Sequence, residues 1–187
     1  KAFEAGLEKV AARYPEDTEA TILHSMVLSA NHDPADKQYG NQLRAATLLE
    51  PVFAKLPEHP GAAHYLIHSY DFPPLATRGL PAAQRYSKIA PAAPHAQHMP
   101  SHIFTRAGAW RESITANAAS AQSDAAAGWN TMHAYDYMVY AHLQLGQDRL
   151  AQGVQDRAKA MAKLSNHFAA AYAYGAMPAR LALERSD

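Results

Sequence analysis

The pattern His-x-x-x-His occurs twice in the chain, at His64/His68 and at His98/His102. The two pairs are separated by the period of a common type of helical repeat, about 34 residues. On an α-helix, residues four apart lie on nearly the same face and are separated by about 6 Å along the axis. Neutral imidazole is a common ligand of transition metals. The two pairs therefore predict a metal site formed by His64, His68, His98 and His102, with Zn, Cu, Ni or Fe as the candidate ion.

Further polar residues have helical spacing that places them on the same face as the second pair. His95 lies three residues before His98, and the same short interval recurs farther along the chain between His133 and Asp136. Arg106 is close to the same cluster, where its guanidinium could hold a carboxylate through two hydrogen bonds or simply meet water. The residues expected to form one ligand-binding groove are His64, His68, His95, His98, His102, Arg106, His133 and Asp136.

A second interpretation gives these histidines no metal. They would then be packing residues between repeats, hydrogen-bonded to tyrosines such as Tyr65 and Tyr137 or to backbone carbonyl groups. The chain contains no HExxH motif, no glycine-rich phosphate-binding motif and no GxSxG motif. The sequence therefore assigns no catalytic residue, and both interpretations stay open.

The elements that must position these side chains are helices. Apolar residues recur at helical spacing almost throughout, and alternating β-branched runs are rare, so the pattern predicts an all-α fold. Proline-bearing links alternate with short turns at Gly108 and Gly146. This alternation predicts helical hairpins, at roughly residues 17–56, 60–89, 94–124 and 130–164.

Composition limits the partners. The chain has 187 residues, 48% of them hydrophobic, which is enough to bury a core as a single domain over residues 1–187. Seventeen basic side chains balance seventeen acidic ones, which argues against nucleic acid or an anionic membrane surface as a partner. No run of eighteen apolar residues occurs, so no membrane span is expected. Cysteine is absent, which leaves imidazole and carboxylate as the ligand chemistry.

Several residues match the pattern of a known helical repeat. Tyr70 and Phe104 are separated by the same interval as the two histidine pairs, and Trp110 is followed by the small Ser113 and Ser120. This pattern resembles the tetratricopeptide repeat. The resemblance implies an α-solenoid of antiparallel helical hairpins in a right-handed superhelix. It also implies a concave groove that binds a peptide or protein partner.

A narrower resemblance is carried by two longer runs, HPGAAHYLIHSYD at residues 59–71 and HAQHMPSHIF at residues 95–104. These runs are similar to those of bacterial tetratricopeptide-repeat proteins whose functions are largely unassigned. Ile67 departs from the small residue that the repeat expects, so the repeat around 60–90 is degenerate. The chain opens on Lys1 within an apolar pattern, which suggests a piece of a longer bacterial chain. Its compartment stays open between cytoplasm and periplasm.

Two classes of function follow from these observations. In the first, the chain is a tetratricopeptide-like binding or scaffold protein whose groove carries the histidine cluster for a ligand, peptide or protein, with a transition metal as the candidate cofactor. In the second, it is a hydrolytic or redox metalloenzyme in which three or four histidines hold the ion and His133 or Asp136 is a further ligand or general base. A third interpretation gives this segment only a supporting role for an active region elsewhere in the longer chain.

Overall fold

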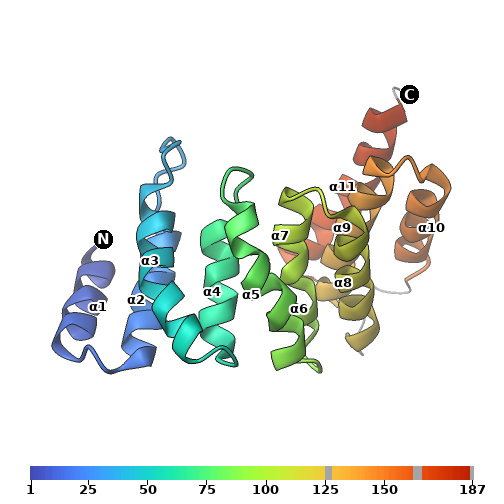
Figure 1. Cartoon of the computed structure of the whole chain (residues 1–187). Coiled ribbons are helices and arrows are strands. Elements are labelled where there is room, and N and C mark those ends of the chain that lie inside the picture. Colours follow the sequence, from blue (N-terminus) through green and yellow to red (C-terminus); the bar gives the residue numbers. More distant parts are fainter. Residues whose placement is uncertain (125–127, 162–165, 186–187) are drawn as a thin grey trace. The chain divides into compact units, whose positions relative to one another are not determined.

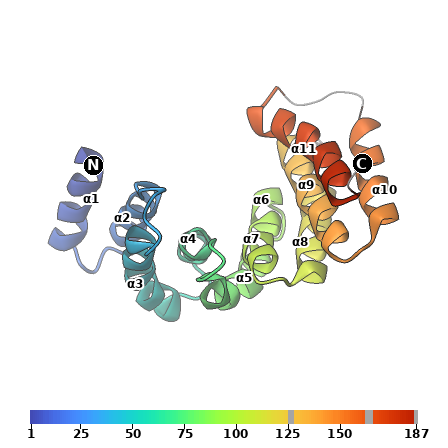
Figure 2. The ribbon, with the colours of Figure 1, turned by 90° about the horizontal axis from the view of Figure 1, so that it is seen from above.

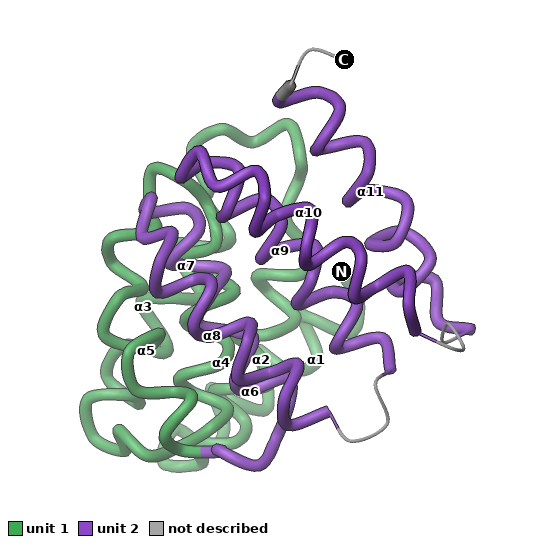
Figure 3. The backbone as a smooth tube through the Cα atoms, turned by 90° about the vertical axis from the view of Figure 1, so that its right-hand side faces the viewer, with its two compact units in different colours: residues 1–89 green, residues 90–187 purple. Residues whose placement is uncertain are grey.

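The computed structural model describes residues 1–124, 128–161 and 166–185, and in these ranges the regular structure is helical throughout (Figure 1). The expectation of an all-α fold is therefore confirmed. The chain divides into two compact units, residues 1–89 (unit 1) and residues 90–187 (unit 2), which are coloured separately in Figure 3. The boundary falls between the hairpins that were expected at residues 60–89 and 94–124.

Unit 1 is built by helices that pack in chain order. They are α1 (Ala2–Arg13), α2 (Thr18–Ala30), α3 (Gly40–Lys55), α4 (Pro60–Tyr70) and α5 (Ala76–Ile89). Each packs against the next, and α2 also touches α4. Figures 1 and 2 show α2 to α5 side by side. Helix α4, which carries the first histidine pair, begins at Pro60, whose fixed φ suits a first helical turn, and the ring of His59 accepts the N–H of Ala62.

Unit 2 is arranged around one central helix. Its helices are α6 (Pro94–His98), α7 (Pro100–Arg106), α8 (Trp110–Ser123), α9 (Trp129–Gln144), α10 (Asp148–Lys159) and α11 (Phe168–Arg185). Helix α9 packs against α8, α10 and α11, and it also touches α6 and α7. The buried apolar core is formed largely from α9, α10 and α11, with Met132, Val139, Leu143, Val154 and Met177 among its members. Helix α9 is therefore the element that holds unit 2 together.

The helix ends follow local chemistry. Gly108 and Gly146 have φ values of +74° and +65°, in the left-handed region that glycine adopts without strain after a helix. They end α7 and α9 at the two turns expected from sequence. The first helical segment of the hairpin expected at residues 94–124 is divided into α6 and α7 between His98 and Pro100. Proline lacks the N–H that would continue the backbone ladder, which explains the break.

The remaining differences lie near the C-terminus. Helix α10 ends at Lys159, short of residue 164, where the fourth expected hairpin was to end. Residues 162–164 lie outside the described residues. In the described ranges, no helix combines the length and the apolar character needed to cross a bilayer.

Candidate metal centre

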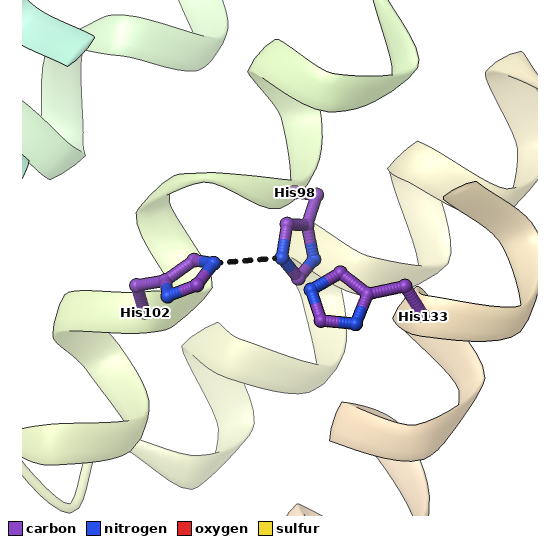
Figure 4. A group of neighbouring side chains, drawn as sticks. All are labelled: His98, His102 and His133. Atoms are coloured by element: carbon purple, nitrogen blue, oxygen red, sulfur yellow. Dashed lines mark hydrogen bonds between the residues drawn. The ribbon is translucent and has the colours of Figure 1, made fainter. Parts of the chain in front are cut away.

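Three imidazoles converge in unit 2. His98 ends α6, His102 lies on α7 and His133 lies on α9. Each offers one ring nitrogen, and these three atoms all lie within 4.8 Å of one another. Figure 4 shows the rings of His98 and His133 turned toward each other, with His102 joined to His98 by a hydrogen bond. In the part of the chain that the structure describes, no other group of three or more potential ligand side chains is this compact.

The break between α6 and α7 does not disturb the histidine pair. The N–H of Met99 donates to the carbonyl of His95, and the N–H of His102 donates to the carbonyl of Met99. Helical coiling therefore continues through Met99, and the two rings stay one turn apart. Their Nε2 atoms are 2.9 Å from each other. Helix α9 touches both short helices and brings His133 to the same place.

A chain of hydrogen bonds fixes the tautomer of His98. The amide nitrogen of Asn117 donates to the carbonyl of Ser113 at 2.8 Å, which leaves its Oδ1 to accept a proton from Nδ1 of His98 at 2.7 Å. Since neutral imidazole carries one proton, Nε2 of His98 then has a free lone pair and accepts the N–H of His102. The last link is the hydroxyl of Tyr137, which lies 3.2 Å from Nδ1 of His102 and donates its proton to that nitrogen.

The hydrogen bond from His98 to Asn117 resembles the contact that orients a metal-binding histidine. A ligating histidine usually gives its second ring N–H to an oxygen acceptor, which orients the ring and raises its basicity. Asn117 does this for His98, which leaves Nε2 of His98 facing Nε2 of His102. For Nε2 of His102 to ligate as well, its proton must move to Nδ1 and the Tyr137 hydroxyl must become an acceptor. No proton needs to leave the site for this change.

Burial favours the neutral form of the cluster. His98 is only 1% exposed, and burial, followed by the nearby His102 and His133, lowers its pKa well below the ordinary value. Burial, with His102 next in importance, also lowers the pKa of His133 to about 4. The metal-binding form of imidazole is the neutral one. Both rings are therefore in the form that binds a metal at neutral pH.

The observed spacing suits a tetrahedral ion. Zinc–nitrogen bonds of about 2.0 to 2.1 Å place two tetrahedral ligand atoms about 3.3 Å apart. The observed span of up to 4.8 Å, with 2.9 Å between the Nε2 atoms of His98 and His102, requires ring movements of up to about 1.5 Å to reach this value. The donor set fits Zn, and imidazole nitrogen also suits Cu, Ni and Fe. Three protein ligands leave a fourth position open.

Asp136 and Arg106 lie at the edge of the cluster. Asp136 is buried and accepts two hydrogen bonds from Arg180, at 2.7 and 3.1 Å. This ion pair accounts for the position of the Asp136 carboxylate, and the ligand or general-base role expected for Asp136 stays a prediction. Arg106 is exposed and borders a pocket together with His102. His95 lies about one helical turn before His98. The centroid of its ring is 6.3 Å from the ring centroid of His98 and 6.1 Å from that of Trp129.

The first histidine pair forms a simpler arrangement in unit 1. The Nε2 atoms of His64 and His68 are 3.0 Å apart, and Nδ1 of His64 lies 3.2 Å from the hydroxyl of Tyr86. His68 is exposed and borders a pocket of about 350 Å³ with Tyr65 and Phe72. The prediction that all four imidazoles bind one ion stays a prediction, because the two pairs belong to different units.

Sequence reasoning missed two residues that organise the site. Asn117 has low helix propensity and lies inside α8, where it is completely buried. A polar residue in such a place is a signal that could have been used. Arg180 gave no comparable signal, because its partner Asp136 is 44 residues away.

No protein-family model, curated protein or solved structure shows a significant match to this chain.

Proposed function

We propose that this chain is a tetratricopeptide-like helical-repeat protein that binds one transition-metal ion through His98, His102 and His133. The observation that carries the proposal is the approach of three imidazole nitrogens to within 4.8 Å of one another. The lowered pKa values of His98 and His133 support it, since both rings are neutral without a metal. The Asn117 contact supports it as well, since it orients His98 in the way that metal-binding histidines are usually oriented.

The repeat assignment is supported by different features. Successive helices pack against each other along unit 1, and turn glycines end α7 and α9. The small residues Ser113 and Ser120, which match the repeat pattern after Trp110, are fully buried. The concave groove and its peptide or protein partner stay predictions.

One feature also favours a catalytic role. Catalytic zinc typically has three protein ligands and a fourth position for water, whose pKa the ion lowers to near 7. The three-histidine set has this form, and His102 borders a pocket of about 270 Å³. The second candidate function is therefore a hydrolytic metalloenzyme that uses the same three ligands.

Metal titration of the untagged, metal-free protein tests the proposal. We expect one equivalent of Zn²⁺ to bind, and X-ray absorption at the zinc edge to give about three nitrogen neighbours at imidazole distances. The variant His98→Gln should remain folded by circular dichroism and lose this binding. No uptake of Zn²⁺, Cu²⁺, Ni²⁺ or Fe²⁺ by the folded parent would contradict the proposal. Hydrolysis of activated esters by the zinc form, absent from the same variant, would support the second candidate.

A further inference from the structure

Unit 1 contains a pocket that shares no residue with the proposed metal site. It has a volume of about 350 Å³ and is bordered by α2, by α4 and by the segments that follow these two helices. This volume is near the lower end of the range for small-molecule sites. The pocket therefore suits a molecule of one or two rings rather than a polymer.

Ring-bearing side chains characterise the wall of this pocket. Four of the lining residues carry a ring and two others are apolar, and these six are Tyr65, Phe72, His32, His68, Met26 and Ala30. A flat aromatic ligand makes favourable stacked or edge-to-face contacts with such rings, and a methionine sulfur also contacts rings favourably. The composition of the wall therefore favours an aromatic ligand.

The two largest rings of the wall are held by their neighbours. Tyr65 stacks on His64, with ring centroids 5.0 Å apart and an angle of 9° between the ring planes. Phe72 packs against Tyr39 at 5.0 Å and meets the ring of His32 edge to face at 6.0 Å. A wall that such contacts already order does not have to be ordered by the ligand, which reduces the entropic cost of binding.

His32 gives the wall a defined hydrogen-bond acceptor. Its backbone N–H donates to the carbonyl of Ser29 at 3.4 Å, and its Nδ1 lies 3.1 Å from the same oxygen. A carbonyl oxygen only accepts hydrogen bonds, so Nδ1 of His32 must carry a proton. In the neutral ring Nε2 then has a lone pair, which can accept an N–H or O–H group of a ligand.

The charges of the lining disfavour an anion. Among the described residues that border the pocket, none is a lysine or an arginine. Asp71 borders the pocket as well, but it already interacts with another group of the chain. The ligand is therefore assigned no charge.

We infer that this pocket binds a small neutral aromatic molecule with one N–H or O–H group. The ring of the ligand contacts Tyr65 and Phe72, and its N–H or O–H group donates to Nε2 of His32. The inference goes beyond the proposed function, because it assigns a second ligand to the chain and depends on no metal.

Titration of the isotope-labelled, metal-free full chain, followed by amide chemical shifts in NMR spectra, tests the inference. The probes are 3-methylindole and 1-methylindole, isomers of which only the first has an N–H group, and benzylammonium, an aromatic cation. The variant His32→Phe keeps a ring but removes the acceptor, and Phe72→Leu removes a ring from the wall. Phe3→Ala is the matched control, because Phe3 is an exposed aromatic side chain of α1 that does not line the pocket.

The parent and Phe3→Ala should bind 3-methylindole equally, with chemical-shift changes centred on α2, α4 and Phe72. The parent should bind 1-methylindole about tenfold more weakly, since its methyl group offers Nε2 of His32 no proton. In His32→Phe the two isomers should bind alike, and Phe72→Leu should bind both more weakly than the parent does.

The inference is overturned if the parent binds the two isomers equally, if neither isomer binds at millimolar concentration, or if the shift changes centre on unit 2. Tighter binding of benzylammonium than of 3-methylindole also overturns it, since the pocket would then select a cation. If the amide spectrum shows that Phe72→Leu is not folded, the comparison of the isomers in the parent and in His32→Phe decides the question.

Discussion

The two His-x-x-x-His pairs have the same spacing but different surroundings. In each pair the Nε2 atoms are about equally close, 3.0 Å between His64 and His68 and 2.9 Å between His98 and His102. In each pair one Nδ1 atom lies 3.2 Å from a tyrosine hydroxyl. The pairs differ in burial, since His68 is exposed and His98 is almost completely buried. The shared spacing therefore gives two similar pairs of rings, and the difference in their surroundings is what supports the proposed metal site at the second pair.

Two neighbours distinguish the second pair. His133, from α9, supplies a third ring nitrogen, and Asn117, from α8, fixes the proton on His98. Ala83 precedes Asn117 by the interval that relates His64 to His98, and its methyl group offers no hydrogen bond. The proposed metal site therefore depends on a ring from α9 and on a polar support from α8, in addition to the histidine pair. The repeated motif alone supplies neither.

The largest effect is expected from removing the third ring. In His133→Ala, zinc affinity should fall by more than about 100-fold, since even loss of a supporting contact costs up to that amount. His64→Ala removes an equivalent imidazole from unit 1 and should leave the affinity within about twofold. Competition with a chromophoric chelator measures both. Equal losses in the two variants would contradict the distinction between the pairs.

The next effect is a pH dependence of the metal-free protein. Burial, followed by the nearby His102, lowers the pKa of His133 in the folded chain to about 4 from an ordinary 6.5, while Asp136 raises this pKa and His95 lowers it. The unfolded chain therefore takes up this proton below about pH 6.5, while the folded chain does so only near pH 4. Stability is fully present above pH 6.5 and is lost as the pH falls toward 4, by up to roughly 3 kcal/mol.

Urea denaturation at pH 7.5 and 4.5 checks this dependence. His133→Gln should show a smaller difference in unfolding free energy between the two pH values than the parent does. His98 shifts in the same direction, so some dependence should remain. An unchanged difference in His133→Gln would show that His133 is not the group responsible.

A smaller effect is expected at the supporting amide. In Asn117→Ala the Nδ1–H of His98 loses its closer acceptor, at 2.7 Å, and keeps only the hydroxyl of Ser101 at 3.5 Å, so zinc affinity should fall by about tenfold. Asn117→Asp keeps an acceptor in place and should restore the affinity to that of the parent or above it. If Asn117→Ala binds zinc as the parent does, the hydrogen bond to Asn117 does not orient the ligand.

The smallest effect is expected from placing an amide side chain in unit 1, at Ala83, the position equivalent to Asn117. Ala83→Asn, made together with His98→Ala, should gain less than about twofold in zinc affinity over His98→Ala alone. The amide supports a ligand but does not supply the third ring, and the compact ligand group of the described residues lies in unit 2. Thermal unfolding should confirm that this buried substitution is tolerated. A tenfold gain would mean that the amide, rather than the third imidazole, makes the difference.

The sequence predicted the local features well. Helical periodicity gave the all-α fold, and the four-residue spacing gave the contact between His98 and His102, because both depend on neighbours within a turn or two. The recurrence of the His95–His98 interval at His133 and Asp136 also placed His133 near the cluster. The position of Asp136 depended on Arg180, which reaches it from α11. The contact between Arg180 and Asp136 depends on tertiary packing between α9 and α11, so residue spacing along the sequence could not reveal it.

The measurement that tests the central claim most directly is zinc stoichiometry in two matched double variants, His98→Ala/His102→Ala and His64→Ala/His68→Ala. Elemental analysis after dialysis against a slight excess of zinc should give one ion per chain in the parent and in the unit 1 variant, and none in the folded unit 2 variant. An ion that persists in the unit 2 variant, or that is lost equally from both, would contradict a metal site formed by His98, His102 and His133.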